Sequence, residues 1–182
     1  VMEIATKLFA RVDHFNELAD DERKFIAGIP NKLGIEGAEY WPFFGSMKGA
    51  GKFKNKIGIN DPLISKALDQ IPVSGQITKT HYDNFVKYYT LTFNGNYIAT
   101  GTRLLCMKRP DTFICFDSKN KASLCRDFGI VQSNMSFDRY WNDIVLRIYD
   151  SEWWKNPEPI NETEKKISAA RAAFLDSLYY EE

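Results

Sequence analysis

The sequence predicts a mainly α-helical protein that forms a single compact domain over residues 1–182. Apolar side chains recur at spacings of three and four along most of the chain, which is the pattern of helices with one buried face. Apolar residues make up 44% of the sequence, enough for a hydrophobic core in a chain of this length. Residues 112–116 are apolar without the helical period, so the prediction includes at most a short extended segment.

The N-terminal part of the chain is expected to contain two helices, over residues 2–18 and 20–29. Residues 34–58 follow with many glycines and aromatic side chains and with neither a helical nor a strand period, which predicts a long loop. Ordered loops of this length are uncommon and are often functional. The next helix is expected over residues 61–70, because an Asp-Pro pair suits the start of a helix.

The central region, residues 80–130, is predicted to hold the functional core. Its first helix is expected behind a Thr80 cap, with an aromatic stripe that packs into the core. The apolar spacing predicts a second helix over residues 99–108 with one buried stripe. After the extended segment, a third helix is expected over residues 119–128.

Asp117 stands at the start of this third helix, next to Ser118. Both residues are favoured at helix N-caps, because a side-chain oxygen can accept a hydrogen bond from a free amide of the first turn. The partial positive charge at a helix N-terminus also favours an ionised aspartate. The simplest interpretation is therefore that Asp117 only caps the helix.

The C-terminal helices are expected over residues 136–180. The first would begin behind Ser136 and turn a broad apolar face toward the core. The last would run from Glu162 to Tyr180, after an aromatic turn that contains Trp153, Trp154, Pro157 and Pro159.

Charge and cysteine content exclude several classes of site. The chain has 24 basic and 24 acidic residues, which argues against a uniformly basic nucleic-acid binder. Lys48, Lys52, Lys54 and Lys56 nevertheless form a local basic segment. The cysteines, at positions 106, 115 and 125, fit the spacing of neither a zinc site nor an iron–sulfur cluster, so no metal and no cofactor are predicted.

Targeting signals are not evident in the sequence. There is no apolar run long enough to span a bilayer and no leader of the secretory type. We therefore expect a cytoplasmic monomer with no membrane partner.

Four short motifs follow one another in residues 91–119. Leu91-Thr-Phe-Asn-Gly95 is followed four residues later by Ala99, then by Pro110, and then by Phe116-Asp-Ser-Lys119. This order resembles the helix-hairpin-helix DNA glycosylases, in which a helix leads into a Leu-Pro-Gly-Val-Gly hairpin. In that family a second helix opens with an alanine, and a loop then delivers a catalytic aspartate in a Val-Asp-Thr-His motif. The match is confined to residues 91–124, and Thr-Phe-Asn replaces Pro-Gly-Val in the hairpin.

The resemblance implies a monofunctional DNA glycosylase that flips a base out of double-stranded DNA and hydrolyses its N-glycosidic bond. Asp117 would stabilise the positive charge that develops on the sugar and orient or deprotonate a water. Lys119 stands where the family often has a histidine and is a candidate to hold a phosphate or to favour the ionised form of Asp117. Tyr97 occupies the place of the lysine nucleophile of bifunctional members, so no lyase step is expected. The base itself, damaged or modified as in phage DNA, stays open.

Two further groups of residues are candidates for contact with DNA. Main-chain amides of the hairpin and side chains of the basic segment would meet phosphates, and these residues are Asn94, Gly95, Asn96, Tyr97, Lys48, Lys52 and Lys54. Aromatic side chains of the long loop would stack on the flipped base, and these residues are Tyr40, Trp41, Phe43 and Phe44. The alternative for the aromatic residues is a lid over the core.

Two other classes of function are compatible with the same residues. Pro110-Asp111 followed by Asp117-Ser-Lys119 imitates the PD…(D/E)xK pattern of magnesium-dependent nucleases, although only five residues separate the two carboxylates. A non-catalytic DNA-binding or protein-binding module is the third class, in which Asp117 would be a cap and no more.

Overall fold

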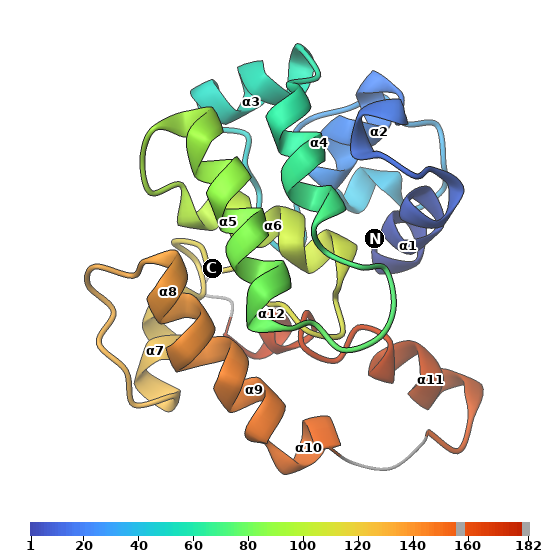
Figure 1. Ribbon diagram of the computed structural model, residues 1–182. Helices are drawn as coiled ribbons and strands as arrows, with labels where there is room; N and C mark the ends of the chain where they lie inside the picture. Colours follow the sequence, from blue (N-terminus) through green and yellow to red (C-terminus); the bar gives the residue numbers. More distant parts are fainter. Residues whose placement is uncertain (156–158, 180–182) are drawn as a thin grey trace.

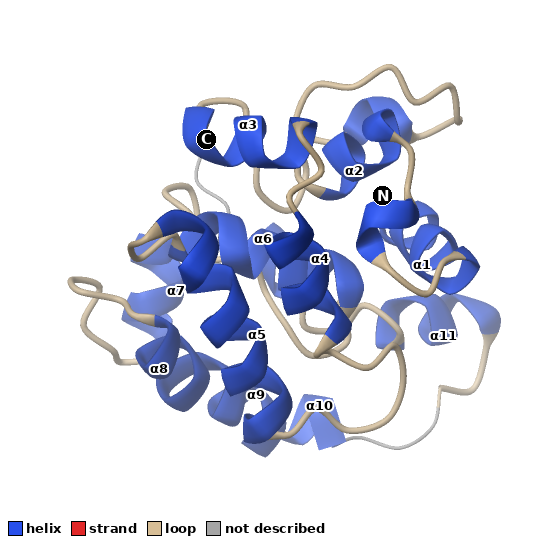
Figure 2. Ribbon diagram, turned by 45° about the horizontal axis from the view of Figure 1, so that its top comes forward, coloured by secondary structure: helices blue, strands red, loops and turns tan. Residues whose placement is uncertain are grey.

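The structure is a computed structural model that describes residues 1–155 and 159–179. Every regular element in these ranges is a helix, and no strand occurs in them (Figure 1, Figure 2). The prediction of a mainly α-helical single domain is therefore confirmed. Along the same residues, no helix is both long enough and apolar enough to cross a bilayer.

The helices differ widely in length. In chain order they are α1 (Met2–Arg11), α2 (Asp20–Ile26), α3 (Gly51–Gly58), α4 (Pro62–Asp69), α5 (Lys79–Phe93), α6 (Ile98–Lys108), α7 (Lys121–Asp127), α8 (Phe137–Arg139), α9 (Leu146–Asp150), α10 (Glu152–Lys155), α11 (Glu162–Ser168) and α12 (Leu175–Tyr179). A π-helical stretch, Tyr140–Val145, joins α8 to α9, and short 3-10 turns lie at Phe15–Glu17 and Ala38–Tyr40.

Helix α6 lies in the middle of the molecule and contacts α1, α2 and α4 (Figure 1). Every residue from Thr100 to Met107 is buried, so the prediction of a single buried stripe on this helix is wrong. A helix enclosed on all sides has no solvent-facing position for a charged side chain. The one arginine within this stretch, Arg103, must therefore find its hydrogen-bond partners inside the protein.

Gly101 allows an aromatic cluster to approach α6 closely. A Cβ atom at this position would lie 2.6 Å from Phe137 Cζ and 3.0 Å from Tyr89 Cε1. We expect Gly101→Ala to lower the free energy of unfolding by about 2 kcal/mol, as overpacking of a core does. Gly58→Ala on α3 is the matched control, because a Cβ there meets nothing within 4 Å. Denaturant unfolding should show the control to be neutral or slightly stabilised, and equal losses in both variants would contradict the packing argument.

The N-terminal half differs from the predicted elements in three places. The loop expected over residues 34–58 ends at residue 50, because Gly51–Gly58 form α3. Phe53 and Ile57, four residues apart, bury one side of this short helix. The first predicted helix ends at Arg11 rather than continuing to residue 18. The cap of α5 is Thr78 rather than Thr80.

The predicted C-terminal helix is divided in the structure. α11 ends at Ser168, and α12 begins only at Leu175. In the turn between them, Ala173 N donates to Pro110 O (2.8 Å) instead of to a carbonyl of the preceding helical turn. Tyr180, the predicted end, lies outside the described residues, as does Pro157. Lys166 on α11 pairs with Glu3 on α1 (2.9 Å). The C-terminal part thus returns to the N-terminal helix (Figure 2).

The apolar segment before Asp117 is buried but belongs to no sheet. Phe116 N donates to Thr102 Oγ1 (2.9 Å), and Ile114 N donates to the hydroxyl of Tyr140 (3.2 Å). That hydroxyl in turn donates to Ile114 O (2.6 Å). Side chains of neighbouring helices therefore take the place of a partner strand, which satisfies the buried backbone and fixes the position of Asp117.

Candidate active site

Arg103 holds the aromatic loop against the core. Its guanidinium is completely buried and donates only to main-chain carbonyls. Its acceptors are Ile26 O (2.9 Å), Phe25 O (3.1 Å), Trp41 O (3.2 Å) and Phe43 O. The arginine therefore connects α2 to the loop from α6, and it cannot belong to a basic surface that meets DNA. Arg109, also buried, is excluded from such a surface for the same reason.

The loop that Arg103 holds is strained where it reaches Asp117. Phe44 has a φ of 64°, which is rare for an aromatic residue, and Gly45 has a φ of 104°. A Cβ at Gly45 would lie 2.4 Å from Cys115 Sγ and 3.5 Å from Asp117 Oδ2, so only glycine fits against this segment. Strained backbone is concentrated at functional sites in proteins. The conformation therefore marks the contact between the aromatic loop and Asp117 as a candidate active site.

Asp117 itself is half-buried and does not cap a helix. Its Oδ1 accepts from Lys119 N (2.7 Å), which closes a local turn, and α7 begins only at Lys121. The predicted helix start at residue 119 is therefore wrong, and so is the interpretation of Asp117 as a helix cap. The side chain of Lys119 is exposed. Asp117 Oδ2, which lies toward Gly45, accepts no hydrogen bond from the described residues.

Asn120 and Asp176 complete the site, and neither was predicted from the sequence. Asn120 Nδ2 donates to Asp176 Oδ1 (2.5 Å) and to Cys115 O (2.6 Å), while Asn120 Oδ1 accepts from Asp117 N (3.1 Å). Asn120 is completely buried, and Asp176 is 5% exposed. α12 thus brings a second carboxylate to the Asp117 loop.

The second carboxylate gives the stability of the protein a pH dependence. Burial raises the pKa of Asp176 to about 6, with a smaller contribution from the charge of Asp117, against an ordinary value of 3.8. The folded protein therefore binds the proton more tightly than the unfolded chain, and Asp176 lowers stability as the pH rises from about 4 to about 6.

We expect Asp176→Asn to be more stable than wild type at pH 7, by about 2 kcal/mol. The asparagine keeps an acceptor for Asn120 and carries no buried charge. The difference should vanish below pH 4, and denaturant unfolding between pH 4 and 7.5 measures it. A difference that does not change with pH would contradict the assignment.

The predicted DNA-contacting residues gather at one end of α5. This helix runs through Leu91, Thr92 and Phe93, so the connection to α6 is the turn of residues 94–97 rather than the predicted hairpin. Within the described residues, the amides of Gly95, Asn96 and Tyr97 donate to no acceptor, whereas Asn94 N donates to Thr90 O (2.9 Å). The Asn96 side chain donates to Met135 O (2.7 Å), which fixes the turn.

Helix α3 brings a lysine to this turn. Lys52 Nζ donates to Phe93 O (2.9 Å) and lies 5.8 Å from the centre of the Tyr97 ring. Lys48 and Lys54 are exposed and form no ion pair with any described residue. The structure therefore brings Lys52, one of the predicted DNA-binding lysines, to the turn of residues 94–97, which lies far away in the sequence.

The four aromatic residues of the loop do not form one pocket. Tyr40 and Phe44 line a cavity of about 600 Å³ together with Phe174, which the sequence did not indicate. Phe44 contacts the Phe174 ring edge-on, with 6.0 Å between the centres. Phe43 is 60% exposed and Trp41 is half-buried, and neither lines this cavity.

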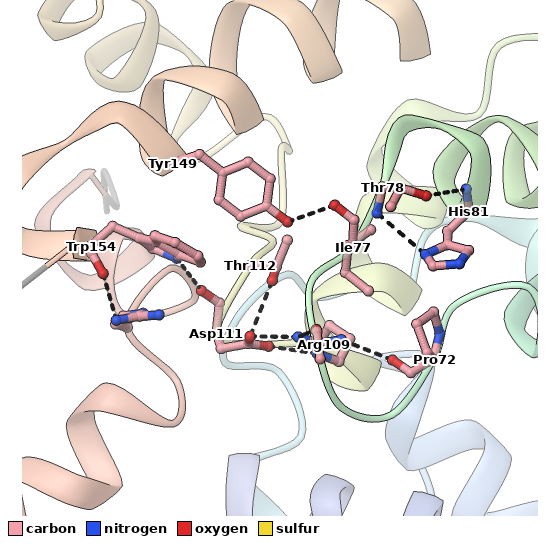
Figure 3. A network of polar contacts seen from close by, with 11 residues as sticks. Pro72, Ile77, Thr78, His81, Arg109, Asp111, Thr112, Tyr149 and Trp154 are labelled. Atoms are coloured by element: carbon pink, nitrogen blue, oxygen red, sulfur yellow. Dashed lines mark hydrogen bonds and ion pairs between the residues drawn. The ribbon is translucent and has the colours of Figure 1, made fainter. Parts of the chain in front are cut away.

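The carboxylate proposed for a nuclease, Asp111, has a structural role. Arg109 Nε and Nη2 donate to its two oxygens (2.8 and 2.7 Å), and Thr112 Oγ1 also donates to it (3.1 Å; Figure 3). Arg109 also reaches the carbonyl of Pro72 (2.9 Å), and Trp154 Nε1 donates to Asp111 O (2.8 Å). This network ties the end of α6 to the loop before α5 and to α10.

The described residues contain no group of three or more histidine, cysteine or acidic side chains arranged to hold a metal ion. The three cysteines are buried free thiols. Burial raises the pKa of the Cys115 thiol beside Asp117. Comparisons of the chain with protein-family models, with curated proteins and with solved structures gave no match. The geometry of the Asp117 site is therefore the basis on which a function can be argued.

Proposed function

We propose that this protein is a monofunctional DNA glycosylase. It extrudes a damaged or modified base from double-stranded DNA, hydrolyses the N-glycosidic bond and leaves an abasic site. The proposal places the protein in the cytoplasm as a monomer, with host DNA or modified phage DNA as the substrate.

The observation that carries the proposal is the position of the Asp117 carboxylate. It follows the helix–turn–helix of α5 and α6 in the order of the glycosylases that the sequence resembles, and it lies against a strained aromatic loop. The loop offers aromatic surface to an extruded base, and base flipping needs such a surface. A half-buried carboxylate is also suited to stabilising a nearby positive charge, because the interaction is stronger where water is partly excluded.

In the proposed reaction, the bond between the sugar C1′ and the base nitrogen breaks, and its electron pair leaves with the base. Positive charge then develops on the sugar ring, where the Asp117 carboxylate stabilises it. A water adds to C1′, its proton passes to Asp117 and then to solvent, and the departed base takes up a proton from solvent. Asp117 Oδ2 is assigned this role, because Oδ1 already accepts from the amide of Lys119.

Contact with the DNA backbone is assigned to α3 and the turn of residues 94–97. Unpaired amides at a turn before a helix, next to a lysine, are suited to phosphate oxygens. We expect Lys52→Ala to weaken DNA binding on all sequences and to reduce the slope of log K against log salt by about 1. Lys66→Ala is the control, because it also removes one positive charge but Lys66 lies over the ring of Tyr88 on α5 rather than at the turn of residues 94–97. Equal salt slopes for the wild type and Lys52→Ala would contradict the assignment.

The test of the function uses the wild-type protein and a panel of duplexes with damaged and phage-type modified bases. Each duplex is incubated once with a chelator and once with magnesium. Every reaction is then divided, and one half is treated with hot alkali to break abasic sites. The proposal predicts strand breaks only after alkali. Breaks without alkali that require magnesium would assign the protein to the nucleases. Binding without any product would make it a non-catalytic module.

A further inference from the structure

The C-terminal segment is attached to the Asp117 loop on both sides of the aspartate. The contacts are Ala173 N to Pro110 O (2.8 Å), Asn120 Nδ2 to Asp176 Oδ1 (2.5 Å) and Ser123 Oγ to Tyr179 O (2.7 Å). α12 also packs on α7. The residues that flank Asp117 are therefore held by a part of the chain that lies far away in the sequence.

Asn120 transmits this attachment to Asp117. An asparagine side chain has two N–H donors and one carbonyl oxygen. In Asn120 one donor binds Asp176, the other binds Cys115 O, and the oxygen accepts from Asp117 N. Because the side chain is completely buried, water cannot replace any of these partners. The orientation of Asn120, and with it the backbone at Asp117, therefore depends on Asp176.

The charge of Asp176 is not needed for this hydrogen bond. Asn120 is the only hydrogen-bond donor to its carboxylate among the described residues, and Asp176 forms no ion pair with them. The charged or titratable groups around it are Arg103 and Cys106 on α6 and Cys115 and Asp117 in the preceding segment. An asparagine would accept the same hydrogen bond without the penalty of a buried charge. The presence of a buried aspartate at position 176 in spite of this free-energy cost indicates that its negative charge has a function.

We propose that Asp176 is a positioning residue for Asp117, acting through Asn120 and through its own negative charge. The inference rests on the proposed glycosylase function for its effect on the reaction. Asp176 holds the Asp117 backbone in place and adds negative potential where the sugar cation forms. It does not touch the reacting atoms.

This role has a kinetic signature, because Asp176 loses its charge below a pH of about 6. We expect the single-turnover rate of the wild type to fall by about 10-fold between pH 7.5 and pH 5. Asp176→Asn carries no charge at either pH. Its rate at both pH 7.5 and pH 5 should therefore be close to the wild-type rate at pH 5, and the fall of about 10-fold should be absent. Asp176→Ala, which also releases Asn120, should be about 100-fold slower than wild type at pH 7.5. Asp138→Asn, an 82% exposed carboxylate on α8, should behave as wild type.

A second readout does not depend on activity. Amide hydrogen exchange at Asp117 reports its hydrogen bond to Asn120, so Asp176→Ala should accelerate it and Asp176→Asn should restore the wild-type rate. A wild-type rate and pH profile in Asp176→Asn, together with wild-type exchange in Asp176→Ala, would overturn the inference. If the wild type releases no base but exchange responds as expected, the positioning by Asp176 stands and the glycosylase proposal fails.

Discussion

Arg103→Leu is expected to lower the free energy of unfolding by about 3 kcal/mol, because it leaves buried carbonyl oxygens without a donor. The guanidinium of Arg103 is the shared partner of the carbonyls of Phe25, Ile26, Trp41 and Phe43. Leucine fills part of the space but donates no hydrogen bond. For a chain of this size the loss corresponds to about 10 °C in Tm.

The matched control is Arg126→Leu, because this arginine is 71% exposed and pairs only with its neighbour Asp127. Substitutions of exposed residues usually change the free energy of unfolding by no more than about 0.5 kcal/mol. Thermal and denaturant unfolding of both variants measure the difference. Equal stability in Arg103→Leu and Arg126→Leu would show that the buried arginine does not hold the loop.

Asp117→Asn is expected to reduce base excision by about 1,000-fold, because it removes the charge that meets the sugar cation and the base that takes the proton of the water. The folded structure should be retained, since the asparagine oxygen can still accept from Lys119 N. Single-turnover excision, measured on the best duplex of the panel, gives the rate. The same preparation should unfold within about 1 kcal/mol of wild type.

Asp127→Asn is the control for this change, because it removes the same charge from the C-terminal end of α7. Its carboxylate is paired with Arg126 at the surface, so the excision rate should stay within about 2-fold of wild type. A residual rate in Asp117→Asn close to that of Asp127→Asn would remove Asp117 from the mechanism.

The helices that follow a clear apolar period could be predicted from the sequence, and those in irregular composition could not. α4, α5 and α6 were predicted with small errors at their ends, because their apolar spacing is regular. α3 was missed because its two buried residues, Phe53 and Ile57, are surrounded by glycine and lysine in the sequence. Its stability comes from tertiary contacts, which a local pattern does not show.

The candidate site was predicted only where its residues are local in the sequence. Asp117 was identified from its own neighbours, whereas Asp176 and Asn120 meet across 56 positions and give no local signal. The structural role of Arg103 was not predicted, although this arginine lies among small and apolar side chains in a predicted helix. A charged residue enclosed by apolar positions on every turn indicates a buried residue with internal partners, and this signal was present in the sequence.

Mass spectrometry of the small molecules released from a duplex that the protein acts on can distinguish a glycosylase from a nuclease. A glycosylase releases a free base and leaves both DNA strands intact until alkali is added. We expect that base to be the only small product of the wild type, formed without metal and lost in Asp117→Asn. Release of nucleotides, or a free base that still appears in Asp117→Asn, would contradict this expectation.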